Sequence, residues 1–301
     1  MARAPTTAAA LLARFDPDWL DLMYNNRRRV PEHGEYFARW AAASLQARTP
    51  QAVLDQRFGP GPQETLDVFP ASAGRVPAGD LAPVLVFIHG GYWRSLDKSD
   101  HSFVAPVFNR QGVCVVVPNY DLCPAVTVPD IVLQMVRALA WTWRHIAQWG
   151  GDPTRILLVG HSAGGQLAAQ LLNTRWSQVG ADLPADLMRH ALSISGLFDL
   201  EPLMHTPSLR EALRLTPEQV ARVSPAWQPA PQGGTLCAVA GLDESSEFMR
   251  HNRLIRRAWG RRAVPVCEAL PGLNHFSVLD ALVTPGHRLH QLALAGLQRR
   301  D

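Results

Sequence analysis

The sequence predicts an α/β fold built around a mostly parallel sheet that is flanked by helices. Short apolar runs recur along the chain and alternate with longer stretches of helical character. One run passes directly into a serine between two glycines and then into an Ala/Leu/Gln stretch, in LLVGHSAGGQLAAQLL at 157–172. Because strands that alternate with helices usually pair in parallel, this order favours a layered α/β domain.

Six segments have the composition of buried strands. They are PVLVFIHG (83–90), GVCVVVPNY (112–120), RILLVGH (155–161), HALSISG (190–196), TLCAVAG (235–241) and AVPVCEAL (263–270). Each is apolar almost throughout, which is typical of strands covered on both faces. The stretch at 128–151 opens with Pro129 and Asp130 and closes on two glycines, which are helix start and stop signals.

We expect a single domain over residues 1–301, with two stretches that depart from the strand and helix alternation. Residues 1–50 are polar and aromatic with helical patterning, and residues 198–232 are a Pro-rich insertion that contains two short helical stretches. Long insertions in compact domains are usually functional. We therefore predict that both stretches contribute to a small helical cap.

The composition is that of a globular protein, with 47% hydrophobic and 18% charged residues and a net charge of +3. The basic clusters at 27–29, 256–257 and 261–262 are short and lack interleaved aromatics, which argues against nucleic-acid binding. No apolar run reaches the ~18 residues of a membrane span, and no signal peptide is expected. The four cysteines form no C-x-x-C pair, which favours buried thiols and a cytoplasmic location.

The pentapeptide at 160–164 satisfies G-x-S-x-G, in which a serine occupies a sharp turn from strand to helix. A Cβ at either glycine would clash with the closely approaching backbone, so the motif exposes the serine hydroxyl above the sheet. A serine that merely caps the helix is the alternative interpretation. The apolar run before it and the helical stretch after it favour Ser162 as a nucleophile.

A second motif, His89-Gly90-Gly91-Tyr92-Trp93, follows the strand predicted at 83–90. An HGG-type turn can direct backbone amides at the oxygen that becomes negatively charged in acyl transfer, each donor contributing ~3 kcal/mol. We expect the amides of Gly91, Tyr92 and Ala163 to form an oxyanion hole.

A serine nucleophile needs a histidine to accept its proton and a carboxylate to orient that histidine. Of the 11 histidines, His275 follows the last predicted strand, where the order nucleophile, acid, histidine places the base. We expect His251, His287 and His290 at the surface of helices. The acid should follow the strand at 235–241, where Asp243 and Glu244 are adjacent. These considerations alone leave both open.

The motifs together resemble the kynurenine formamidase (arylformamidase) branch of the α/β-hydrolase superfamily, near the hormone-sensitive-lipase-like esterases. The segments concerned are GHSAGG, HGGYW, SGLFDLEPL, DESSEF and GLNHFSVLD, with YNNRRRVPEH and DQRFGPGPQETLDVFP near the N-terminus. The resemblance covers nearly the whole chain and implies the α/β-hydrolase fold. In that branch the triad acid stands six positions ahead of an arginine. Counting back from Arg250, the resemblance favours Glu244 over Asp243.

The function that follows is a serine hydrolase, free of cofactor and metal, that cleaves small acyl groups from aryl esters or from aryl formamides of the N-formylkynurenine type. Tyr92 and Trp93 are expected to contact this small-molecule substrate. Other candidates for an apolar pocket are Tyr24, Tyr36, Phe37, Trp40, Phe198 and Trp227.

One alternative is a general short-chain carboxylesterase without formamidase activity. A second is an inactive binding protein on the same fold, which should show damage at a catalytic position, and none is seen. We expect no nucleic-acid or membrane partner, and a homodimer stays open.

Overall fold

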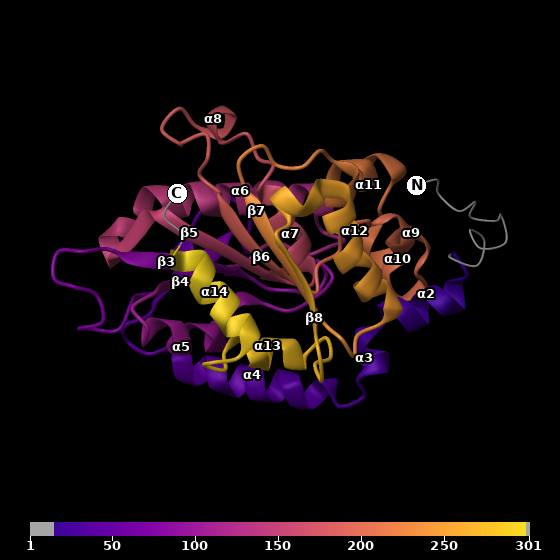
Figure 1. The fold of residues 1–301 in the computed structure, drawn as a ribbon, viewed down its shortest axis with the longest axis horizontal. Helices are drawn as coiled ribbons and strands as arrows, with labels where there is room; N and C mark the ends of the chain where they lie inside the picture. Colours follow the sequence, from indigo (N-terminus) through magenta and orange to yellow (C-terminus); the bar gives the residue numbers. More distant parts are fainter. Residues whose placement is uncertain (1–14, 299–301) are drawn as a thin grey trace.

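The computed structural model describes residues 15–298, which form one eight-stranded sheet with helices on both faces (Figure 1). The strand order is β1-β2-β4-β3-β5-β6-β7-β8, and β3 to β8 pair in parallel. The strands are β1 Val53–Arg57, β2 Thr65–Phe69, β3 Ala82–Ile88, β4 Cys114–Pro118, β5 Gly151–His161, β6 His190–Ile194, β7 Thr235–Gly241 and β8 Val266–Leu270. The predicted mostly parallel sheet is therefore confirmed.

The hairpin of β1 and β2 was not predicted from the sequence. These strands pair antiparallel with each other, and β2 pairs antiparallel with β4 at one edge of the sheet. Their sequences, VLDQR and TLDVF, carry charged residues and lack the continuous apolar run of the central strands. The predicted strand at 263–270 is also shorter, because Ala263 still belongs to the preceding helix.

Helices cover the sheet in two layers. The α-helices are α2 Pro17–Tyr24, α3 Asn26–Arg29, α4 His33–Ala47, α5 Ala105–Asn109, α6 Val128–His145, α7 Ala163–Leu171, α8 Trp176–Val179, α9 Glu201–His205, α10 Pro207–Leu213, α11 Pro217–Val223, α12 Ser246–Ala263, α13 Ser277–Leu282 and α14 Arg288–Gln298. Short 3-10 helices are η1 Lys98–Asp100, η2 Ser102–Val104, η3 Ile146–Trp149 and η4 Pro225–Trp227.

Alternation along the strands separates two apolar cores. In β3, Val84 and Val86 pack with α6, α7 and α12, whereas Leu85 and Phe87 pack with α4, α5, α13 and α14 on the opposite face. Every second side chain of a strand points to the same face. Both faces of the central strands are thus buried, as their continuous apolar sequences predict.

The parallel strands bring the carboxyl ends of β3, β5, β6, β7 and β8 to one edge of the sheet, where binding sites of such folds form. Parts of both proposed cap stretches lie at this edge: α2, α3 and α4 from residues 1–50, and α10 from residues 198–232. The first fourteen residues of the N-terminal stretch lie outside the described residues.

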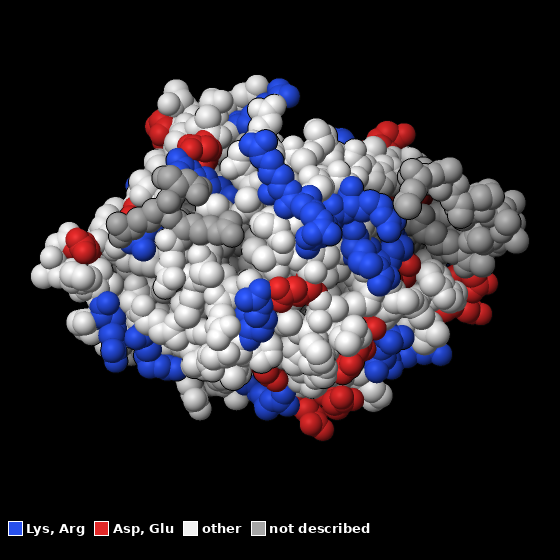
Figure 2. All heavy atoms as spheres, in the orientation of Figure 1, with Lys and Arg blue, Asp and Glu red and all other residues white. Residues whose placement is uncertain are grey.

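The surface drawn in Figure 2 carries its largest group of Lys and Arg side chains over α12. Its exposed members include Arg253, Arg257, Arg261 and Arg262. No helix within residues 15–298 is both long enough and apolar enough to cross a membrane.

Candidate active site

Ser162 occupies a strained turn between β5 and α7. Its φ of 57° and ψ of −116° are unfavourable for a residue with a side chain. The flanking glycines make the turn possible: a Cβ on Gly160 would lie 2.0 Å from the Gly164 carbonyl oxygen, and one on Gly164 would lie 2.1 Å from the Ile88 carbonyl oxygen. The G-x-S-x-G spacing is thus a steric requirement of this turn.

Ser162, His275 and Glu244 form a chain of hydrogen bonds. The Ser162 hydroxyl lies 3.1 Å from His275 Nε2, and His275 Nδ1 lies 2.6 Å from Glu244 Oε2. All three residues are buried. In this geometry Nδ1 carries the proton donated to the carboxylate, and the unprotonated Nε2 faces the hydroxyl.

Glu244 is the carboxylate that meets His275. Its Oε1 accepts hydrogen bonds from the Gly241 amide at 2.7 Å and from the Ser195 hydroxyl at 2.5 Å, which leaves Oε2 directed at the imidazole. Asp243, the alternative acid, is exposed, and its backbone amide bonds the Leu273 carbonyl. The sequence left Asp243 and Glu244 open as the acid, and these contacts favour Glu244.

Ser195 was missed by the sequence analysis. It follows β6, has a φ of 54°, and its hydroxyl reaches Glu244 from the neighbouring strand end. A serine after a strand has no sequence signal for this contact. The contact exists only because β6 and β7 are neighbours in the sheet.

His161 orients the loop that carries His275, since its Nε2 donates to the His275 carbonyl oxygen at 2.9 Å. Burial, followed by the His275 and His101 charges, lowers the pKa of His161 well below its ordinary value, which keeps the ring neutral.

The expectation that His251 and His290 lie at the surface of helices was wrong. His251 and His290 are buried in the packing of their helices rather than exposed.

The HGG turn lies beside Ser162 in the wall of the same cavity. Gly91 has a φ of 101°, and a Cβ there would lie 2.0 Å from the Ser95 carbonyl oxygen. Among the described residues, the Gly91 and Tyr92 amides have no hydrogen-bond acceptor. Ala163 begins α7, where helix amides lack an intrahelical partner. These three amides are available to a substrate oxygen.

A buried polar network supports the HGG turn from behind. Tyr120 donates its hydroxyl to the carbonyl oxygens of His89 and Gly90 at 3.0 Å, and His89 Nε2 lies 3.0 Å from Asn119 Oδ1. Asn119 Nδ2 in turn donates to Asp97 Oδ2 at 2.6 Å, beyond the turn. The turn is thus fixed at both ends.

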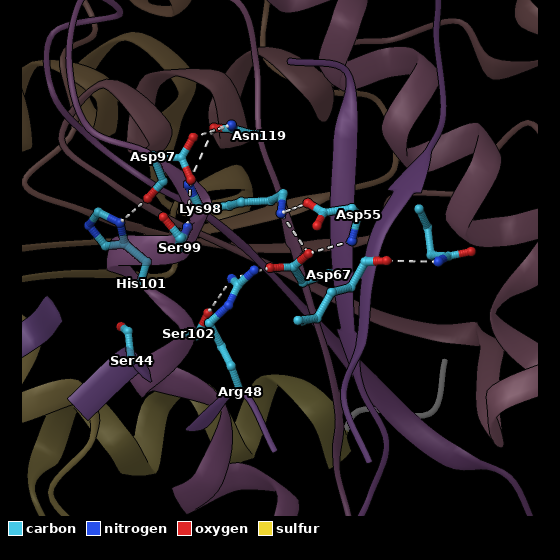
Figure 3. A network of polar contacts seen from close by, with 12 residues as sticks. Ser44, Arg48, Asp55, Asp67, Asp97, Lys98, Ser99, His101, Ser102 and Asn119 are labelled. Atoms are coloured by element: carbon cyan, nitrogen blue, oxygen red, sulfur yellow. Dashed lines mark hydrogen bonds and ion pairs between the residues drawn. The ribbon is translucent and has the colours of Figure 1, made fainter. Parts of the chain in front are cut away.

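Figure 3 shows how this network continues to the β1–β2 hairpin. The buried Lys98 ammonium lies 2.6 Å from carboxylate oxygens of both Asp55 and Asp67, and Arg48 donates to the second oxygen of Asp67 at 2.7 Å. Because Lys98 and Asp67 are each paired with an opposite charge, neither is left as an uncompensated charge in the interior. The hairpin that the sequence did not predict thereby anchors the segment that follows the HGG turn.

The cavity above Ser162 measures about 60 Å³. Its aromatic lining is Tyr24, Phe37, Trp40, Tyr92 and Phe276. Four of the expected aromatics, Tyr24, Phe37, Trp40 and Tyr92, are thus present. Phe198 is buried in the core, and neither Tyr36 nor Trp227 lines this cavity.

The expectation that Trp93 contacts substrate is wrong. Trp93 is fully buried in the core, where its indole donates to Gln166 Oε1 at 3.2 Å. Both Tyr92 and Trp93 have positive φ, at 50° and 55°. Tyr92 lines the cavity and donates its hydroxyl to the Tyr24 carbonyl oxygen at 2.7 Å, while Trp93 packs beneath the turn. The two residues are adjacent in the sequence, and nothing there indicated that their side chains point in opposite directions.

Within residues 15–298, no three His, Cys, Asp or Glu side chains gather as metal ligands would. The groups available for chemistry at this edge are a hydroxyl, an imidazole, a carboxylate and backbone amides. This set is suited to acyl transfer.

Comparisons with known proteins agree with this class of site. A family model described as alpha/beta hydrolase fold matches residues 85–232. The chain is 30% identical over 254 residues to kynurenine formamidase of Salmo salar, covering 81% of each chain. It is 31% identical over 206 residues to esterase LipQ of Mycobacterium tuberculosis, covering 64% of this chain and 47% of that one.

Among solved structures, a protein from Silicibacter sp. TM1040 described as a thioesterase superimposes with a TM-score of 0.78 at 28% identity, covering 91% of this chain and 98% of that one. The chain therefore belongs to the arylformamidase-like branch of the α/β hydrolases and acts as a hydrolase on ester or formamide bonds.

Proposed function

We propose that the chain hydrolyses small acyl groups from aryl esters or aryl formamides through an acyl-enzyme on Ser162. The observation that carries the proposal is the hydrogen-bonded series from Ser162 through His275 to Glu244, which ends in a cavity of about 60 Å³. The proposed chemistry requires no cofactor and no metal.

In the first step, the Ser162 oxygen attacks the acyl carbon while His275 Nε2 accepts the hydroxyl proton. Negative charge on the former carbonyl oxygen is bound by the amides of Gly91, Tyr92 and Ala163. The bond to the leaving group then breaks, and His275 returns its proton to the departing oxygen or nitrogen. Water, deprotonated by His275, releases the acyl group and restores the Ser162 hydroxyl.

The substrate class rests on the size and lining of the cavity. The cavity, about 60 Å³ in all, must admit the acyl group together with the leaving group, which favours formyl or acetyl groups over long acyl chains. Aromatic side chains around it suit a flat aromatic leaving group. The Salmo salar relative is named a kynurenine formamidase, which makes N-formyl-L-kynurenine a substrate to test.

The second candidate is a short-chain carboxylesterase without formamidase activity, favoured by the similarity to esterase LipQ. An amide is harder to cleave because its amine departs only after His275 protonates it. We therefore expect ester turnover to exceed formamide turnover in an enzyme of broad specificity.

The test combines active-site labelling with a substrate series. A fluorophosphonate probe should label the wild type once and leave Ser162→Ala unlabelled. Values of kcat/KM on N-formyl-L-kynurenine, p-nitrophenyl acetate and p-nitrophenyl decanoate should be highest for a short acyl group. Labelling that persists in Ser162→Ala would refute the nucleophile. Preference for the decanoate would refute the short-acyl claim. Turnover of the acetate without formamidase activity would support the second candidate, a short-chain carboxylesterase.

A further inference from the structure

Two arginines border the cavity, and no carboxylate of residues 15–298 lies opposite them. Arg27 follows α2 on α3, and Arg94 follows the HGG turn, and both line the cavity that contains Ser162. Among the described residues, the lining includes no Asp or Glu. Among ion pairs between described residues, neither arginine takes part, whereas Arg28, next to Arg27, pairs with Asp21. The cavity mouth is therefore positively charged and uncompensated.

The two guanidinium groups are close enough to affect each other. Desolvation, and then the charge of Arg94, lowers the pKa of Arg27. The Arg27 guanidinium also lies over the Phe37 ring, 5.4 Å from its centroid, which favours a defined orientation toward the aromatic wall. Two neighbouring cations repel each other, and an anion between them would relieve that repulsion.

A third group at the cavity has an unused donor. Asn26 lines the cavity and is 5% exposed, and its Nδ2 has no hydrogen-bond partner among the described residues. A buried donor without a partner costs free energy, so such groups are rare in folded proteins. A ligand acceptor that reached this nitrogen from the cavity would satisfy it.

We propose that Arg27, Arg94 and Asn26 form a subsite for a carboxylate carried by the aromatic leaving group of the substrate. A carboxylate accepts hydrogen bonds only, which matches three donor groups with no competing acid, and arginine pairs with it through two parallel hydrogen bonds. The acyl group lies at Ser162, the ring lies among Tyr92, Phe37 and Trp40, and the carboxylate lies at the cavity mouth. This assignment rests on the proposed role of Ser162 as the nucleophile.

The test compares two esters that differ at one ring substituent, a charged carboxylate in 3-acetoxybenzoate and a neutral amide in 3-acetoxybenzamide. The measured quantity is the ratio of their kcat/KM values, because a defect in folding or in the catalytic groups affects both esters alike. The wild type should prefer the carboxylate. Arg27→Gln and Arg94→Gln should each lower the ratio by about 10-fold, the loss expected for one charge-assisted pair near the surface. Arg29→Gln is the matched control, since Arg29 is exposed on the same helix and does not line the cavity.

The outcomes separate this subsite from the proposed function. Unchanged ratios in both variants, with hydrolysis still lost in Ser162→Ala, would overturn the subsite and leave the hydrolase. If neither ester is hydrolysed, the proposed function fails, and calorimetry with benzoate and benzamide tests the subsite without turnover. Benzoate should bind the wild type more tightly than benzamide, and Arg27→Gln should remove that difference. Equal binding of the two compounds by the wild type would overturn the subsite.

Discussion

Replacing Glu244 by glutamine should impair catalysis far more than replacing its neighbour Asp243 by asparagine. Glu244 receives hydrogen bonds from His275, Ser195 and Gly241, whereas the Asp243 side chain is exposed. The two substitutions remove the same charge from adjacent positions. Any difference between them therefore reports on the contacts of the individual side chains.

The geometry around Glu244 determines the size of the effect. A glutamine amide has one acceptor and one donor end, yet both carboxylate oxygens of Glu244 now accept. If the NH₂ group faces His275, the imidazole must place its proton on Nε2, where it can no longer accept the Ser162 proton. If the NH₂ group faces Ser195 and Gly241, the buried Gly241 amide loses its acceptor. In Ser-His-Asp triads the wrong tautomer lowers kcat by about 10⁴, and we expect a loss of that order for Glu244→Gln.

The assay is kcat on p-nitrophenyl acetate for the wild type, Glu244→Gln and Asp243→Asn, with urea unfolding to establish that each variant is folded. Asp243→Asn should retain kcat within about 3-fold, as surface substitutions usually do. A loss in Asp243→Asn that equals or exceeds the loss in Glu244→Gln would refute the assignment of the acid. Small and equal losses would show that another carboxylate orients His275.

Two further predictions concern groups around this site. Ser195→Ala should lower kcat about 10-fold while leaving KM nearly unchanged, because Glu244 loses a charge-assisted hydrogen bond at 2.5 Å; an unchanged kcat in Ser195→Ala would contradict this role. Burial, followed by the charge of His89, lowers the pKa of His101 to about 3. In the unfolded chain this histidine is protonated below about pH 6.5, whereas in the folded chain it stays neutral down to about pH 3. Stability therefore falls as the pH falls through this window, by about 2 kcal/mol at about pH 5 for His101 alone. Urea midpoints measured at about pH 5 and pH 7.5 should differ less in His101→Phe than in the wild type, and an equal difference would refute the assignment.

The local motifs were predictable because their sequences have steric causes within a few residues. Gly160 and Gly164 are required by backbone atoms that approach within van der Waals distance, and Gly91 by a positive φ and the Ser95 carbonyl. His275 was predictable from its order along the chain, since the loop after the last strand meets the strand ends. These features need little knowledge of the tertiary structure.

The directions of individual side chains were not predictable in the same way. Asp243 and Glu244 are neighbours of nearly equal chemistry, and only the positions of Ser195 and Gly241 select the one that faces His275. Trp93 was placed in the pocket because it follows the HGG motif, yet a turn with positive φ sends it into the core. Both outcomes depend on contacts between segments that are distant in sequence.

The N-terminal helices illustrate how such distant contacts couple separate parts of the site. Tyr24 ends α2, its carbonyl oxygen accepts from Tyr92 in the HGG turn, and its hydroxyl donates to Glu247 at 2.6 Å on α12. Burial, followed by the charge of Glu247, raises the pKa of Tyr24, so the hydroxyl stays protonated and remains a donor. Arg250 closes the same cluster by pairing with Glu247.

Through Tyr24, one segment touches the turn with the proposed oxyanion amides and α12, the helix that begins two residues after Glu244, the proposed triad acid. The residues that follow it, Asn25 to Arg27, line the cavity. A segment that the sequence analysis proposed as part of a cap thus contributes one wall of the cavity that contains Ser162. Its two hydrogen bonds, from the Tyr24 hydroxyl to Glu247 and from Tyr92 to the Tyr24 carbonyl oxygen, hold Arg27 in place relative to Ser162, so the proposed carboxylate subsite and the proposed chemistry at Ser162 would depend on the same contacts.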